Sequence, residues 1–156
     1  MNTEILEKPL TYEEERGKPL PSLNHGIIQT NLILQFAQHR EYRIVSELTL
    51  KIGGKDYTPD LSIYPQRAMD LEHDISKMTE LPLSVVEIFS PQQGSQEVMD
   101  KVEIYLTQGV KSCWIVSPPL ATISIRTADG YRKSFASGVI KDPATGLTAD
   151  LGAVFA

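Results

Sequence analysis

Two carboxylates in this chain have the types and positions that a metal-dependent hydrolase needs. Glu87 lies in the middle of the apolar run 83–89, and Asp60 follows Pro59 in an earlier apolar segment. Burying an ionised carboxylate is costly, so Glu87 needs a cation, a hydrogen-bond donor or a proton. Two close carboxylates repel each other unless they share a proton or bind a cation, and oxygen ligands suit Mg²⁺ or Mn²⁺. Together they predict a divalent metal site that lowers the pKa of a bound water.

A lysine on the segment that follows Glu87 can serve the same chemistry. Lys101 aligns with Glu97 and Tyr105 at steps of four along a predicted helix. From there it can orient the attacking water or neutralise charge on a phosphate. A plainer interpretation stays open, in which Glu97 and Lys101 form a surface pair worth about 0.2–0.5 kcal/mol and Asp60 is a turn residue.

The elements that position these residues follow from the apolar pattern. Residues 83–89 predict a strand covered on both faces, and a second apolar strand follows at 112–116. Between them a helix capped by Ser95 runs to about residue 107. Such a strand–helix–strand unit places its two strands parallel and adjacent. Asp60 belongs to the returning strand, 57–64, of a hairpin that begins at residue 43. It meets Glu87 only if that strand pairs with the 83–89 strand.

The remaining segments predict a helix, a loop and further short strands. A helix begins near Ser22 or Asn24 and carries His25 in its first turn, where most histidines have no functional role. Residues 65–82 predict a long loop. A hairpin turns at Asp129 and Gly130, and short strands and turns follow. The apolar positions of the helix share one face, namely Ile28, Leu32 and Phe36.

The bulk properties limit the class of protein. The 156 residues suit one domain, predicted over residues 22–156 after a lead-in at 1–21, and the 41% hydrophobic content argues against disorder. No apolar run is long enough to span a bilayer, no signal peptide is evident, and Cys113 is the single cysteine, so we expect a cytoplasmic protein. The net charge of −5 argues against a protein that coats nucleic acid unaided, although a metal site contributes its carboxylates to that total.

Four segments in order carry a resemblance to a known family. They are TPDLS at 58–62, VVEIFSP at 85–91, KVEIY at 101–105 and GVKSCWIVSP at 109–118. This set resembles the Uma-two family, restriction-endonuclease-like proteins of the PD-(D/E)XK nuclease superfamily, from about His25 to Pro118. The resemblance implies an α/β (α+β) restriction-endonuclease-like core, in which a central mixed β-sheet is flanked by α-helices and carries an acidic metal site.

The same resemblance implies roles for individual residues of a Mg²⁺- or Mn²⁺-dependent DNA endonuclease. Asp60 corresponds to the acid of the Pro-Asp motif and Glu87 to the second metal ligand, and Glu47 matches a further acidic position that can act as a ligand or a base. The superfamily's lysine normally lies two residues after the glutamate, where this chain has Phe89. In this family the lysine is moved to the next helix, which matches Lys101.

Other functions and contacts remain open at this point. Ser90 and Tyr105 are weaker candidates for contacts to phosphate or to the metal ligands. The net acidity and Phe89 favour, as an alternative, a nuclease fold that binds nucleic acid or another protein without cutting. Glycoside hydrolysis by two carboxylates is a third class, but the aromatic content of 7% and the placement of Trp114 in a strand offer no sugar platform. A homodimer is expected by analogy, because cutting a duplex is simplest with two sites.

Overall fold

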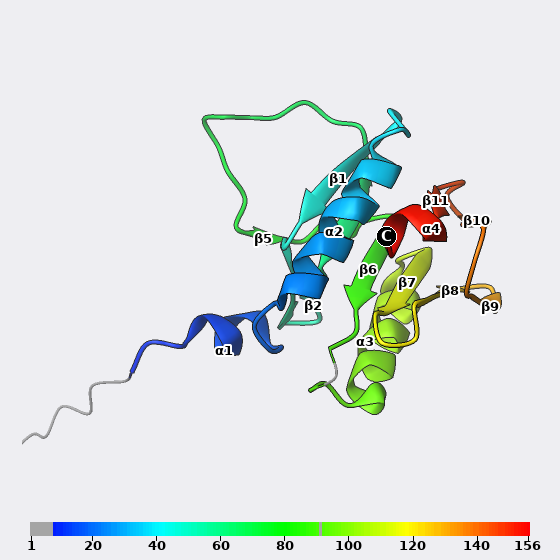
Figure 1. Cartoon of the computed structure of the whole chain (residues 1–156). Helices are drawn as coiled ribbons and strands as arrows, with labels where there is room; N and C mark the ends of the chain where they lie inside the picture. Colours follow the sequence, from blue (N-terminus) through cyan, green and yellow to red (C-terminus); the bar gives the residue numbers. More distant parts are fainter. Residues whose placement is uncertain (1–7, 91) are drawn as a thin grey trace, which may run out of the picture.

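A six-stranded mixed sheet forms the centre of the computed structural model, which describes residues 8–90 and 92–156 (Figure 1). Residues 1–7 of the predicted lead-in and Pro91 of the second motif lie outside the described residues. In spatial order the strands are β1 (Tyr42–Ser46), β4 (Leu61–Pro65), β6 (Ser84–Ile88), β7 (Ser112–Ser117), β8 (Thr122–Thr127) and β9 (Arg132–Phe135). β6 and β7 pair in parallel, whereas the other neighbours pair antiparallel.

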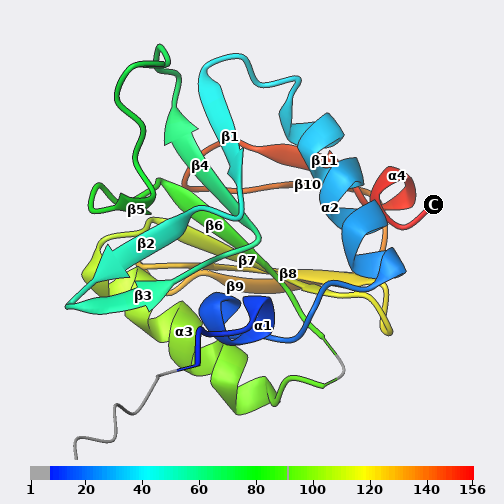
Figure 2. The ribbon, with the colours of Figure 1, turned by 90° about the vertical axis from the view of Figure 1, so that its left-hand side faces the viewer.

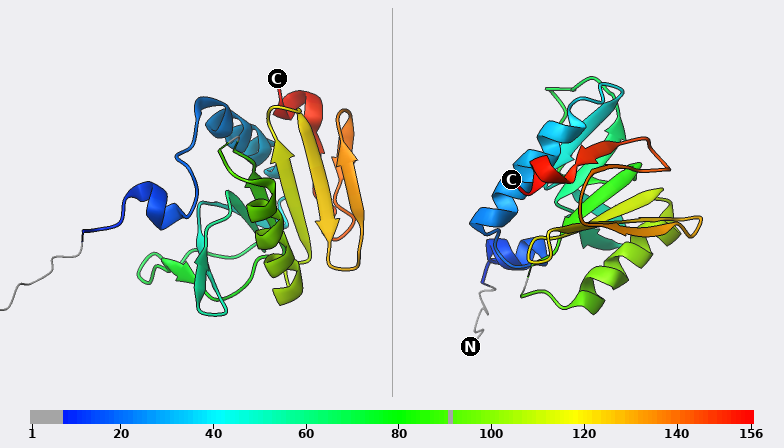
Figure 3. Two further views of the ribbon diagram at one scale, coloured as in Figure 1. Left: turned by 90° about the horizontal axis from the view of Figure 1, so that it is seen from below. Right: turned by 45° about the vertical axis from the view of Figure 1, so that its right-hand side comes forward.

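Helices cover both faces of this sheet (Figure 3). α2 (Leu23–Phe36) and the short α4 (Leu151–Val154) pack on one face, and α3 (Ser95–Gln108) packs on the other. α2 buries Ile28, Leu32 and Phe36, the predicted apolar face, against inward side chains of the central strands. The predicted mixed sheet flanked by helices is therefore confirmed. Among the helices that the structure describes, none is long and apolar enough to cross a membrane.

The predicted crossover unit is present and holds Glu87 at the centre of the sheet. β6, α3 and β7 follow one another, and Glu87 pairs in register with Ile115 of β7. Gly109 ends α3 with a φ of 122°, a conformation that L side chains rarely adopt. The predicted cap was wrong by one residue, because Gly94 occupies the N-cap position and Ser95 is the first residue of the helix.

The predicted first hairpin divides into two at Glu47. This residue has a φ of 56° and its N–H donates to the Asp60 carbonyl at 3.1 Å. The chain therefore changes direction, so β1 pairs with β4, while β2 (Thr49–Ile52) pairs with β3 (Lys55–Tyr57). Leu50 consequently packs on the α3 side and Ile44 on the α2 side, whereas positions 44 and 50 of an unbroken strand would share a face. β4 also pairs with β6, as the approach of Asp60 to Glu87 requires.

Short elements complete the chain around this core. The predicted loop 65–82 contains a two-residue strand, β5 (Lys77–Met78), which pairs in parallel with β2. Near the C-terminus β10 (Val139–Lys141) and β11 (Thr148–Asp150) form a separate ribbon.

The predicted lead-in contains a helix and two buried cations. α1 (Tyr12–Arg16) begins at the N-cap Thr11 and ends at Gly17, which has a φ of 68°. α1 precedes α2 in the chain and lies to one side of the layered body (Figure 1), so it is in front of the body when the molecule is turned (Figure 2). Arg16 and Lys18 are nevertheless only 6% exposed each, because residues 16–19, here called the strap, turn back toward the sheet.

Candidate active site

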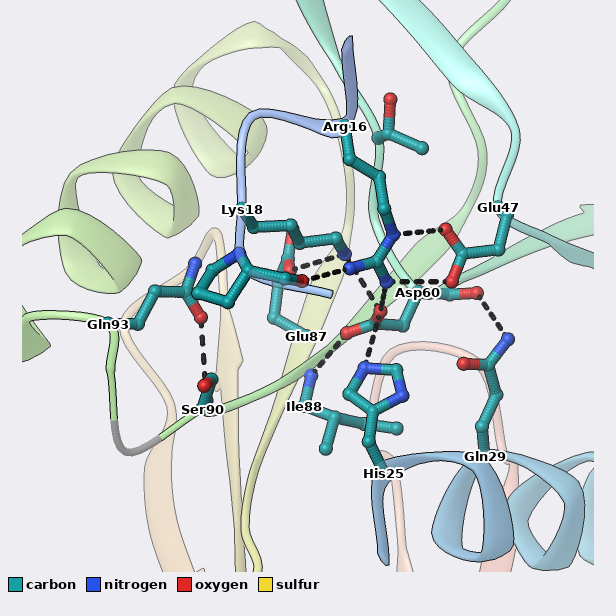
Figure 4. Close-up of polar contacts among 12 residues, drawn as sticks. Arg16, Lys18, His25, Gln29, Glu47, Asp60, Glu87, Ile88, Ser90 and Gln93 are labelled. Atoms are coloured by element: carbon teal, nitrogen blue, oxygen red, sulfur yellow. Dashed lines mark hydrogen bonds and ion pairs between the residues drawn. The ribbon is translucent and has the colours of Figure 1, made fainter. Parts of the chain in front are cut away.

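Asp60 and Glu87 come together between neighbouring strands (Figure 4). The antiparallel register pairs Leu61 with Val86, which places Asp60 opposite Glu87. Asp60 is 0% exposed and Glu87 is 3% exposed. The Lys18 ammonium lies 2.8 Å from Asp60 Oδ1 and 3.6 Å from Glu87 Oε2, so a single cation lies against both carboxylates.

Asp60 is surrounded by donors, three of them cationic or able to become so. Its Oδ1 lies 3.1 Å from Arg16 Nη2, 2.8 Å from Lys18 Nζ and 2.9 Å from His25 Nε2, and its Oδ2 accepts the Ile88 N–H at 2.7 Å. Burial acts to raise the pKa of Asp60, but the His25 hydrogen bond and the Lys18 charge outweigh it, so the pKa lies below its ordinary value. Asp60 is therefore held ionised.

Glu87 has the opposite tendency. Burial raises the pKa of Glu87 above its ordinary value; the charge of Lys18 opposes this effect and the charge of Asp60 adds to it. The Tyr105 hydroxyl donates to Glu87 Oε1 at 2.9 Å and fixes the orientation of the carboxylate. The site thus combines a firmly ionised acid with one that takes up a proton more readily.

Glu47 reaches this site only through a cation. Arg16 donates to it from two nitrogens, Nε at 3.1 Å to Oε2 and Nη2 at 2.9 Å to Oε1, and Nη2 also contacts Asp60. Arg16 Nη1 donates to the Pro19 carbonyl at 2.6 Å, which closes the strap on itself. The structure therefore places Glu47 at the outer edge of the site, with a side chain that is 28% exposed.

Lys101 lies near the acid pair but bonds elsewhere. Its ammonium is 3.7 Å from Glu97 Oε1, the i,i+4 pair of the plainer interpretation, although its charge still acts to lower the pKa of Glu87. Phe89 packs, half-buried, with the apolar cluster on the α3 side. The structure thus brings together Asp60, Glu87 and Tyr105, and leaves Lys101 paired to its own helix.

Comparison with known proteins identifies the family. The sequence model of Uma2, described as "Putative restriction endonuclease", matches residues 12–148. The chain belongs to the Uma2 family. Among solved structures, the Uma2 chain is similar to the "putative nuclease belonging to DUF820 from Anabaena variabilis ATCC 29413", with a TM-score of 0.73 and 21% identity over 88% of this chain and 83% of that one. No curated protein matches it. The predicted family and fold are confirmed.

The cations of this Uma2 site were missed from the sequence. Arg16 and Lys18 lie in a segment without apolar periodicity, which the sequence interpretation treated as a lead-in. His25 carried a usable signal, because it precedes Ile28 and Leu32 on the buried face of α2. A polar side chain at such a position needs a partner, and that partner is Asp60.

A cavity lies beside the strap, next to the cations that contact the acid pair of this Uma2 chain. Its volume is about 350 Å³. Both strap cations and His25 line it, together with residues of the segment that follows β6, namely Phe89, Ser90, Gln92 and Gln93. Ser90, a weaker candidate from the sequence, therefore faces the cavity rather than the carboxylates.

The donor set of the Uma2 site suits a hard divalent cation. Within residues 8–90 and 92–156 no three histidine, cysteine, aspartate or glutamate side chains form a cluster that could hold a metal. Asp60 and Glu87 provide two carboxylates that can face one cation, and in this structure the cation between them is the Lys18 ammonium. Mg²⁺ often binds through one or two carboxylates and keeps several waters, so the pair fits this ion.

Proposed function

We propose that this Uma2 protein is a Mg²⁺- or Mn²⁺-dependent endonuclease that hydrolyses phosphodiester bonds in DNA. The observation that carries the proposal is the convergence of Asp60 and Glu87, two buried carboxylates from neighbouring strands, on a single cation. The description of the Uma2 family and that of the similar Anabaena variabilis protein also support a nuclease.

The chain's own residues prepare the acid pair for such an ion. Asp60 and Glu87 would hold it, with Asp60 oriented by the Ile88 N–H and kept ionised by His25, and Glu87 oriented by Tyr105. Contacts of this kind around metal ligands fix their geometry before the ion arrives. When bound, Mg²⁺ supplies Lewis acidity, which polarises a phosphoryl oxygen and lowers the pKa of a bound water.

The decisive test is cleavage of supercoiled plasmid DNA with and without Mg²⁺. We expect Glu87→Ala to abolish cleavage while circular dichroism and the unfolding midpoint show a folded protein. Glu103→Ala, which removes an exposed glutamate of α3, is the matched control and should cut normally. Full metal-dependent cleavage by Glu87→Ala refutes the assignment.

Metal binding provides a readout that does not depend on cleavage. We expect calorimetric titration with Mn²⁺ to show binding to the wild type and none to Asp60→Ala. Absence of Mn²⁺ binding by the wild type argues against the proposal even if DNA is bound.

A second candidate is a nuclease fold that binds nucleic acid or a protein without cutting. Two observations favour it: Arg16 and Lys18 already neutralise charge at the acid pair, and Phe89 replaces the usual lysine. Salt-dependent DNA binding without metal-stimulated cleavage supports this alternative. In either case a homodimer would present two sites to a duplex, which sedimentation at several protein concentrations tests.

A further inference from the structure

The lysine that contacts the acid pair comes from the strap and not from α3. Lys18 Nζ lies 2.8 Å from Asp60 Oδ1 and 3.6 Å from Glu87 Oε2, and its side chain is 3% exposed. Lys101 Nζ instead pairs with Glu97 at 3.7 Å, and its side chain is 19% exposed. Of these two lysines, only Lys18 has its ammonium against both carboxylates.

The strap that carries Lys18 is anchored by other groups. Arg16 binds Glu47 through two nitrogens and the Pro19 carbonyl through a third. Gly17 permits the sharp turn out of α1 with its φ of 68°. None of these contacts uses the Lys18 side chain. The ammonium can therefore shift within the site while the strap stays docked.

Lys18 also has room to move. It lines the cavity of about 350 Å³ beside the strap, together with Ser90 and Gln93. Asp60 Oδ1 already has contacts from Arg16, Lys18 and His25, so a divalent ion that binds this oxygen must replace one of them. A lysine that rotates toward the cavity leaves space for the ion and keeps its charge beside it.

We propose that Lys18 is the lysine of the catalytic set, an assignment that rests on the proposed nuclease function. In the hydrolysis a water oxygen forms a bond to phosphorus and loses a proton to solvent. The bond from phosphorus to the leaving sugar oxygen breaks with its electron pair going to that oxygen, which takes up a proton from solvent. Lys18 keeps its proton and donates hydrogen bonds to the water or to a non-bridging phosphate oxygen. A fixed ammonium next to developing negative charge stabilises the transition state.

Chemical labelling tests the placement of Lys18 without any cleavage assay. We expect acetylation by an N-hydroxysuccinimide ester, followed by peptide mass spectrometry, to modify Lys18 at least about tenfold more slowly than Lys101, with and without Mn²⁺. Equal rates for the two lysines without the metal overturn the placement. Mn²⁺-induced labelling of Lys18 at the rate of Lys101 shows that the strap leaves, and this result also overturns the proposal.

Cleavage of plasmid DNA then tests the role. We expect Lys18→Met to lower kcat about 100-fold or more with Mn²⁺ binding retained, and Lys101→Met to lower it less than about tenfold. Lys141→Met, in the exposed part of β10, is the control that keeps wild-type activity. Lys18→Cys followed by 2-bromoethylamine should restore cleavage, since the introduced thiol lies against the cavity that Lys18 lines, whereas the native Cys113 is 0% exposed and does not line it.

The outcomes separate this assignment from the proposed function. A wild type that binds no Mn²⁺ and cuts no DNA refutes the nuclease itself. A wild type that cuts while Lys18→Met cuts equally well, or faster, refutes only the assignment of Lys18. Faster cleavage by Lys18→Met identifies the strap as a plug on the acid pair.

Discussion

Two fully buried aspartates in this fold are stabilised in different ways. Asp60 and Asp142 are both 0% exposed. Asp142 accepts hydrogen bonds from neutral donors, namely the Ser112 hydroxyl, the Trp114 indole N–H at 2.8 Å and the Ala144 N–H at 2.8 Å. Asp60 has one backbone donor, from Ile88, and otherwise contacts the side chains of the strap and of α2.

The difference distinguishes Asp142, whose contacts are structural, from Asp60, which we propose to be a metal ligand. The donors of Asp142 belong to β7 and to its own turn, so they cannot leave without disrupting the sheet. Those of Asp60 include two long cationic side chains on the strap, which is not a strand of the sheet. Cations can be exchanged for another cation, whereas fixed dipoles cannot. The contrast predicts that Asp142 serves stability and that Asp60 serves binding.

The largest expected effect is on stability at Asp142. Asp142→Ala leaves Trp114 Nε1 and the Ser112 hydroxyl buried without their acceptor, which we expect to lower the free energy of unfolding by about 3 kcal/mol. Urea unfolding followed by Trp114 fluorescence measures it. A loss of less than about 1 kcal/mol would show that the contacts of Asp142 stabilise the fold no more than those of Asp60, and would contradict the distinction between the two aspartates.

Asp60→Ala should lower the free energy of unfolding less than Asp142→Ala does, and it should also loosen the strap locally. Asp60→Ala should cost about 1–2 kcal/mol, because Arg16 and Lys18 are released to solvent instead of remaining buried without a partner. Release should accelerate tryptic cleavage at the Arg16–Gly17 bond under native conditions. Asp142→Ala is the control, in which this bond stays protected until the whole domain unfolds. Protection that is equal in the two variants would show that Asp60 does not hold the strap in place.

The two acids of the site should also differ in how their contribution to stability depends on pH. The pKa of Glu87 is raised by burial, so the folded state binds a proton more tightly than the unfolded state, and stability falls as pH rises from the ordinary Glu pKa through the folded value. Asp60 has a lowered pKa and the opposite sign: its contribution is present above its unfolded pKa and is lost as pH falls through the folded value.

Glu87→Gln should therefore gain stability over the wild type as the medium becomes less acidic. We expect the gap to grow by about 1 kcal/mol between pH 4 and pH 8, since the amide cannot ionise and its oxygen still accepts from Tyr105. Urea unfolding of both proteins at several pH values gives the gap. A gap that shrinks with rising pH would show that the charge of Lys18 outweighs burial.

The smallest predicted difference concerns the backbone at Glu47. Its φ of 56° is unfavourable for a residue with a Cβ, and both Glu47→Gly and Glu47→Ala lose the contacts to Arg16 equally. Glu47→Gly should be more stable than Glu47→Ala by about 1 kcal/mol, because glycine adopts this conformation without strain. Thermal unfolding of the two variants measures this backbone strain alone. Equal unfolding midpoints would show that the positive φ at position 47 is not strained.

Much of the core around Glu87 could be predicted from the sequence. The apolar runs on either side of α3 specify the parallel pair, and the returning strand brings Asp60 to Glu87. A hydrophobic period indicates which side chains pack on one face of an element, and it therefore also predicted the buried face of α2. These are the parts of the fold in which burial and local propensity agree.

The cations of the site could not be predicted in this way. Arg16 and Lys18 are buried by ion pairs with residues more than 30 positions away, and such pairs have no local signature. The change of direction at Glu47 lacks the glycine that usually marks a positive φ. Asp142 precedes Pro143 in a turn, and no local pattern indicates that donors of a distant strand reach it and bury it.

The order in which these groups leave the ribosome has a consequence for folding. The strap is synthesised before either carboxylate, and its contacts to Asp60 span 44 and 42 positions of the chain. Its docking must wait until β4 and β6 have paired, and it then closes a long loop onto a finished surface. During that interval a nascent chain carries two acids without the guanidinium and the ammonium that later neutralise them.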